Sequence, residues 1–187
     1  MANADAPQGF VPLRHLSGGS MSRNEAYTIA SAYNTDIFTG DPVKLVAAGS
    51  IEQAAAGNRI LGVFAGCEYT DAAGNVVFSK YWPADTVATN IKAYVYDDPN
   101  IVFEIQSAGT PAATNVGNLA DHEVGTGSTS TGRSGAELSG TMGTGAAGFR
   151  ILGIVERPDN SYAANANVEV MIYEHEFSRV DPATPGV

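Results

Sequence analysis

Few residues of this chain could carry acid–base or metal chemistry. Its three histidines are His15, His122 and His175, and the last two each stand between two acidic residues, as Asp-His-Glu and Glu-His-Glu. Such a group could bind a metal ion only if its side chains converged. On a strand, successive side chains point to opposite faces, so each histidine would diverge from its acidic neighbours. We therefore predict no metal site and no catalytic residues in these clusters.

Two further motifs have structural interpretations. The segment Gly143-Thr-Gly-Ala-Ala-Gly148 fits the pattern G-x-G-x-x-G, but dinucleotide binding needs a strand before it and a helix after it. Here a glycine-rich stretch precedes the motif and a strand-like run follows. Cys67 is the only cysteine and lies in an apolar run, which indicates a buried side chain and excludes an internal disulfide. We expect no cofactor and no enzymatic activity, with a hydrolase using scattered Asp, Glu and His residues as one alternative.

Strand-like segments dominate the rest of the sequence. Only 16% of the residues are charged, which is too few for coiled coils or long solvated helices. Apolar or alternating runs recur at short intervals, with turn-forming residues between them. These runs are 43–46, 59–64, 76–82, 91–96, 101–106, 149–155 and 168–174. The pattern predicts a mainly β fold, either a compact β-sandwich or a β-barrel.

Helices are expected only as one or two short elements, at 51–56 and 116–121, because segments of this length are not stable alone. A chain of 187 residues favours a single domain. We place this domain at residues 20–178, between an extended N-terminal arm at 1–19 and a C-terminal tail at 179–187. A long Gly/Ser/Thr-rich loop is expected at 125–148.

Two groups of residues are candidates for a capsid or subunit interface. The N-terminal arm carries several apolar side chains within a few residues, which favours docking on a neighbour over a free tail, with a simple edge strand as the alternative. Aromatic residues gather at 81–82, where the alternatives are core packing, an interface and sugar stacking. The candidate interface residues are Phe10, Val11, Pro12, Leu13, Arg14, Leu16, Tyr81 and Trp82.

The charge of the chain bears on its partners. Twenty acidic and ten basic side chains give a net charge of −10. Binding to nucleic acid through phosphates requires clustered basic groups, and none are present, so direct nucleic-acid binding is disfavoured. No apolar run has the length of a membrane span and the first residues do not resemble a secretory leader, so we expect neither membrane insertion nor secretion.

Several longer motifs resemble those of a family of small virion structural proteins of tailed bacteriophages. The similarity extends from about residue 9 to residue 177. Its markers are Gly9-Phe-Val-Pro-Leu-Arg14, Phe38-Thr-Gly-Asp-Pro-Val-Lys-Leu45, Ile60-Leu-Gly-Val-Phe-Ala-Gly-Cys67, Tyr81-Trp-Pro83, Ala93-Tyr-Val-Tyr-Asp-Asp-Pro-Asn100, Gly127-Ser-Thr-Ser-Thr-Gly-Arg-Ser-Gly135 and Arg150-Ile-Leu-Gly-Ile-Val-Glu-Arg-Pro-Asp-Asn160.

This resemblance implies a capsid decoration, or cement, protein that binds the outer surface of a shell of major capsid protein. It also implies a β-rich homo-oligomer, commonly a trimer, made in the host cytoplasm and located on the virion. The alternatives are a carbohydrate-binding or adhesin module of a phage tail or fibre, and the shell-forming subunit itself. The modest length and the lack of a long helix argue against the last of these.

Overall fold

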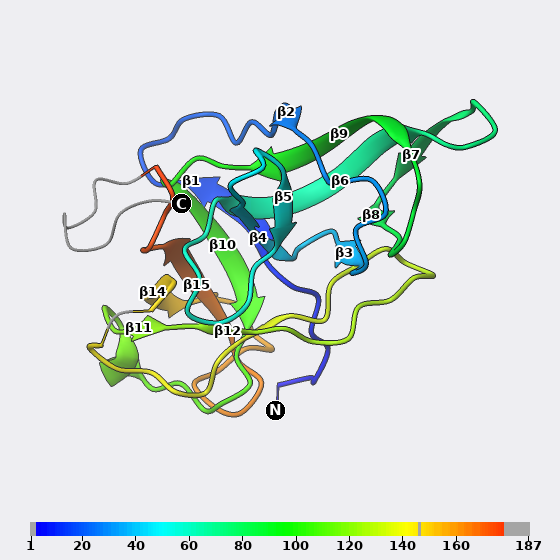
Figure 1. The fold of residues 1–187 in the computed structure, drawn as a ribbon. Helices are drawn as coiled ribbons and strands as arrows, with labels where there is room; N and C mark the ends of the chain where they lie inside the picture. Colours follow the sequence, from blue (N-terminus) through cyan, green and yellow to red (C-terminus); the bar gives the residue numbers. More distant parts are fainter. Residues whose placement is uncertain (1–2, 146, 178–187) are drawn as a thin grey trace.

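The computed structural model describes residues 3–145 and 147–177, so the predicted tail at 179–187 lies outside the described residues. These residues form a mainly β fold, as predicted (Figure 1). One antiparallel sheet has the strand order β1-β10-β15-β14-β11. Its strands are β1 (Val11–His15), β10 (Ile101–Gln106), β15 (Asn167–Ile172), β14 (Phe149–Ile154) and β11 (Leu119–Ala120).

The second sheet has the order β2-β9-β6-β4-β5, and β7 pairs with the distal half of β6. Its strands are β2 (Asn24–Tyr27), β9 (Thr89–Tyr96), β6 (Gly62–Thr70), β4 (Pro42–Leu45), β5 (Ile51–Gln53) and β7 (Val76–Ser79). Two short pairs complete the fold: β3 (Ile37–Phe38) with β8 (Tyr81–Trp82), and β12 (His122–Glu123) with β13 (Glu137–Leu138).

The sheets enclose two hydrophobic clusters. The first lies against the β10-β15-β14 sheet and includes Phe103, Phe149 and Val63. The second includes Phe64 and Trp82. Val63 and Phe64 are neighbours on β6, and because successive side chains of a strand point to opposite faces, this strand contributes to both clusters. In the described part of the chain neither sheet closes on itself, so the barrel alternative is wrong.

The expected short helices are almost entirely missing from the described residues. The one helical element is a 3₁₀ turn at Ala113–Asn115. Residues Ile51–Gln53, predicted to be helical, instead form β5, because Ile51 donates a backbone hydrogen bond to Thr28 and the segment pairs with β4. Pairing across the sheet outweighs the helix propensity of a segment too short to form a helix alone.

β10 lies in the middle of the fold and is buried along its whole length. Its two polar residues therefore need partners, because a buried polar group without one is costly. Glu104 accepts a hydrogen bond from Arg157 at 2.6 Å. Gln106 accepts one from the backbone N–H of Ala6 at 2.8 Å and donates to Asp5 and Glu137. The N-terminal segment thus satisfies polar groups of the central strand.

The described part of the glycine-rich segment predicted as a loop at 125–148 contains the short strand β13, and its first half packs against the rest of the domain. A Cβ atom at Gly125 would come within 1.8 Å of the carbonyl oxygen of Gly135, so the two arms of the loop touch through their backbones. A Cβ at Gly127 would lie 2.1 Å from the ring of Phe38. Glycine is required at these positions because the neighbouring atoms leave no room for a side chain.

Candidate interaction surfaces

The structure places Phe10 in the hydrophobic core, with 1% of its surface exposed. Its ring stacks on Phe149 at a centroid distance of 4.3 Å and meets Phe103 edge to face at 6.3 Å. Residues Val11–His15 continue as β1, which pairs antiparallel with β10. This corrects the prediction that Phe10 docks on another protein: the segment docks on its own domain.

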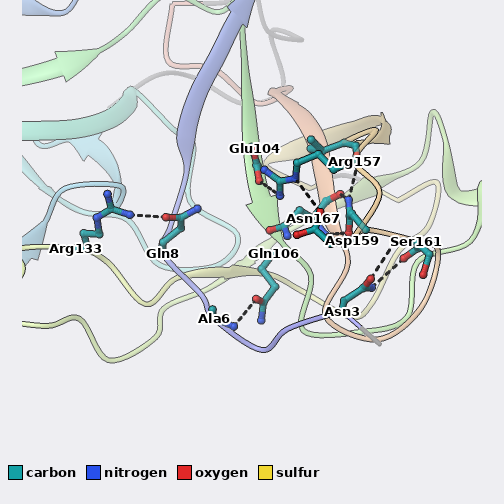
Figure 2. A network of polar contacts seen from close by, with 12 residues as sticks. Asn3, Ala6, Gln8, Glu104, Gln106, Arg133, Arg157, Asp159, Ser161 and Asn167 are labelled. Carbon is teal, nitrogen blue, oxygen red and sulfur yellow. Dashed lines mark hydrogen bonds and ion pairs between the residues drawn. The ribbon is translucent and has the colours of Figure 1, made fainter. Parts of the chain in front are cut away.

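Polar contacts hold the residues before Phe10 in place (Figure 2). Asn3 donates hydrogen bonds to the carbonyl oxygens of Ser161 and Ala164, both at 2.9 Å, and accepts one from the N–H of Ser161. The N–H of Ala6 binds Gln106, and Gln8 accepts a hydrogen bond from Arg133. The predicted arm is therefore attached from Asn3 to β1 by contacts within this chain.

The other predicted residues of the segment are more accessible. Leu13 is 36% exposed and Leu16 is 50% exposed. Arg14 is exposed and pairs with Glu169 on β15 at 2.6 Å, while Val11 and Pro12 are half-buried. Met21, which sequence reasoning did not select, is also exposed. Leu13, Leu16 and Met21 define what we call the Leu13 surface.

Trp82 lies in the second hydrophobic cluster and is fully buried. Its ring meets Tyr69 edge to face at 5.3 Å, and its indole Nε1 has no hydrogen-bond partner among the described residues. Tyr81 is half-buried and stacks on Phe38 at 5.2 Å. The structure corrects the prediction that Trp82 contacts a neighbour: of the alternatives considered, core packing holds, and the ring cannot stack on a sugar.

The most exposed apolar side chains within a strand lie on β7. The sequence predicts one strand from 76 to 82, but β7 ends at Ser79. Val76 is 58% exposed and Phe78 is 72% exposed, and they share a face because they are two residues apart. The β6–β7 hairpin carries them away from the body of the domain, at the upper right of Figure 1. An uncharged Val-Val-Phe-Ser run after a turn was the signal available in the sequence.

A shallow groove of about 280 Å³ lies beside Phe78. Arg23 lies over the ring of Tyr94, 4.6 Å from its centroid, and Tyr94 donates a hydrogen bond to Glu68 at 3.0 Å. Cys67 also borders the groove but is buried, and burial raises the pKa of its thiol to about 12. The thiol therefore stays protonated and unreactive at neutral pH.

The histidine clusters do not form a metal site. Within residues 3–145 and 147–177, no group of three or more His, Cys, Asp or Glu side chains is arranged to hold a metal ion. His122 is buried, and its Nε2 lies 2.8 Å from the carbonyl oxygen of Ala54. His175 is buried, and its Nδ1 accepts a hydrogen bond from the N–H of Phe177. Both imidazoles belong to the packed interior.

We expect these two histidines to make the protein less stable in mild acid. Burial lowers the pKa of His122 and of His175 below the ordinary value. As the pH falls below about 6.5, the unfolded chain therefore takes up protons that the folded chain does not, and the free energy of unfolding decreases. Urea unfolding at pH 7 and pH 5 measures this loss, and H122Q should show a smaller loss than the wild type.

Asp41 has the opposite effect on the free energy of unfolding as the pH falls. Burial raises the pKa of its carboxyl group, so the folded chain takes up this proton more readily than the unfolded chain. Both proteins keep Asp41, so the comparison between wild type and H122Q measures the part of the pH dependence that involves His122, its interaction with Asp41 included. An equal pH dependence in the two proteins would contradict the assignment to His122.

The G-x-G-x-x-G pattern is not followed by the helix that dinucleotide binding requires. Gly143 and Gly148 belong to a loop that leads directly into β14, so no helix follows the G-x-G-x-x-G pattern. Among the described residues no helix is long and apolar enough to cross a membrane.

Exposed apolar side chains occur in several places, and two groups of them are close in sequence: the Leu13 surface, and Val76 and Phe78 on the β6–β7 hairpin. Contiguous apolar patches on a protein surface are a usual sign of protein contacts, whereas single exposed apolar side chains are common. Comparison with known proteins adds no further guide, since no family model, no curated protein and no solved structure significantly matches this chain.

Proposed function

We propose that this protein is a non-enzymatic virion structural protein that binds the outside of a phage capsid and stabilises contacts between major capsid protein subunits. The observation that carries the proposal is the Leu13 surface: Leu13 is exposed on β1, which pairs with the central strand β10, and Leu16 and Met21 are exposed in the segment that follows. A preformed apolar surface binds without the cost of ordering a flexible segment.

Capsid cement works by adding contacts that exist only when neighbouring subunits are in place. A protein bound across such a junction stabilises the assembled shell, because separation of the subunits would require loss of that binding free energy. Oligomerisation, a trimer in the resemblance described above, would multiply weak contacts. The mainly β fold and the phage-like motifs agree with this proposal.

The charge of the chain agrees with a position outside the shell. A net charge of −10 would be repelled by packaged DNA inside the capsid. On the outer surface the same charge favours solubility and leaves apolar side chains to make the contacts. The alternative role as a sugar-binding module has lost its strongest candidate residue, because Trp82 is fully buried.

Co-sedimentation with expanded empty shells of the phage that encodes the chain tests the proposal. Purified wild-type protein at micromolar concentration should pellet with the shells and raise their thermal stability. The triple variant L13S/L16S/M21S should bind at least about tenfold more weakly, because it loses the apolar contacts at the centre of the proposed interface.

The matched control is V116S/V124S, which removes two exposed apolar side chains located elsewhere on the chain. It should bind like the wild type, and circular dichroism should show that both variants keep the β fold. Failure of the wild-type protein to bind shells at micromolar concentration would contradict the proposed function. Equal losses in the two variants would show that the contact is not at the Leu13 surface.

A further inference from the structure

The outer edge of β7 is open. In the described part of the chain β7 pairs only with β6, so one side of its backbone has no neighbouring strand. Proteins protect such edges with charged residues, proline or a β-bulge, because an open edge can pair with another chain. β1, at the edge of the other sheet, shows all three: it contains Pro12 and Arg14, with a register shift between them. β7, with the sequence Val-Val-Phe-Ser, has none of them.

The register of the hairpin identifies the backbone groups at the open edge. The N–H of Asp71 binds the carbonyl oxygen of Asn75 at 2.9 Å, which makes these residues a hydrogen-bonded pair. Hydrogen-bonded and non-hydrogen-bonded pairs alternate along an antiparallel ladder. The pairs formed by Val76 and Phe78 with β6 are therefore the non-hydrogen-bonded ones. Their own N–H and C=O groups point away from β6, toward the open edge.

The backbone and the side chains at this edge both favour the addition of another strand. Val76 and Phe78 are the two residues whose backbone groups point outward, and they are also the two with exposed apolar side chains on one face. A strand added beside β7 would form hydrogen bonds with these backbone groups and would cover these apolar side chains. This combination is the requirement for pairing by strand addition.

We propose that the added strand is β7 of a second copy of this chain, antiparallel, with a twofold axis at Val77. This register opposes Val76 of each copy to Phe78 of the other as a hydrogen-bonded pair. An aromatic residue opposite a β-branched one is a favourable cross-strand pair. The sequence is thus complementary to itself, as a twofold interface requires.

The charges around β7 also favour a second copy of this chain as the partner. The strand itself carries none, so two copies can approach there even though each chain has a net charge of −10. Lys80 is exposed just after β7, and the antiparallel register brings it near the partner's turn, which carries Asp71. Hydrogen bonds from Asn75 lower the pKa of Asp71 and keep it ionised, so the charges that approach each other are opposite in sign.

This interface is separate from the Leu13 surface and goes beyond the proposed function. If three copies associate through another part of the surface, the β7 contact would join neighbouring oligomers on the shell. Self-association through β7 is a property of the purified protein and can be measured without capsids. The two proposals therefore fail independently.

Sedimentation velocity of the full chain measures the self-association. The average mass of the wild type should rise across micromolar concentrations. F78K should weaken this association at least about tenfold, because it removes the cross-strand pair and places a cation at each end of the paired strands. The control is F177K, since Phe177 is 60% exposed but lies outside β7. A wild type that shows no concentration dependence, or an equal loss in F177K, would overturn the proposal.

A cross-linking experiment tests the register. At the twofold axis the two Val77 residues form a non-hydrogen-bonded pair, whose Cα atoms lie about 4.5 Å apart, close enough for a disulfide. V77C should form a disulfide-linked dimer under mild oxidation, whereas V76C should not, because in this register Val76 faces Phe78 of the other copy. The native Cys67 is buried and lies opposite Ser79 in the β6–β7 register, so position 79 is left unchanged in this experiment. Equal cross-linking at both positions would contradict the register. If the wild type is monomeric and F78K loses binding to shells, the self-association proposal is wrong and the open edge of β7 binds capsid protein instead.

Discussion

Replacement of Phe10 by alanine should lower the free energy of unfolding by about 3–5 kcal/mol. The side chain is 1% exposed and contacts two aromatic rings of the first cluster, Phe149 and Phe103. Truncation would remove apolar surface from the core and leave a cavity between strands that belong to distant parts of the chain. Urea unfolding followed by circular dichroism measures the change.

L16A is the control, because Leu16 lies in the same part of the chain but is 50% exposed. Its effect on stability should stay within about 0.5 kcal/mol, the range usual for surface positions. The opposite pattern, with F10A as stable as the wild type but deficient in shell binding, would restore the view of this segment as a docking arm. The structure and the sequence interpretation thus predict opposite phenotypes for one substitution.

The mainly β fold could be predicted from sequence because its signal is local. β15 shows this clearly: Val168, Val170 and Ile172 are buried, and the residues between them are more exposed. Such alternation requires only that one face of the strand be covered. Which strand lies beside which is a long-range property, and no short segment contains it.

The position of Phe10 shows the consequence. Its burial depends on the pairing of β1 with β10, whose residues Phe103 and Glu104 lie far away along the chain. Within its own segment, an apolar residue that fills the core and one that binds a partner have the same sequence signature. The alternative that this segment forms an edge strand was open from the sequence, and the structure supports it.

The prediction of a single strand at 76–82 is wrong for another reason. A single strand would place Val76, Phe78 and Trp82 on one face, because they are separated by even numbers of residues. The first two are 58% and 72% exposed, whereas Trp82 is fully buried. The chain therefore changes partner after Ser79, from β6 to β3, and the alternation restarts. Pairing on both sides of this break decides which aromatic residue is exposed.

Replacement of Trp82 by alanine should also destabilise the fold by about 3–5 kcal/mol. The indole is enclosed in the second cluster and meets Tyr69 edge to face. W82F should recover much of the lost stability, since the indole Nε1 has no hydrogen-bond partner among the described residues and the phenyl ring loses only volume. Thermal or urea unfolding followed by circular dichroism suits both variants, because Trp82 is the only tryptophan and fluorescence would be lost with it.

F78A provides the contrast for W82A, because both residues are aromatic and belong to the same segment of the sequence. Phe78 is 72% exposed, so its truncation should change the stability of the monomer by no more than about 0.5 kcal/mol. If W82A instead kept the wild-type stability and abolished binding to glycans, the indole would have to be accessible and the sugar-binding alternative would regain its basis. A large loss of stability in W82A with none in F78A would place the core on one side of the break at Lys80 and the binding surface on the other.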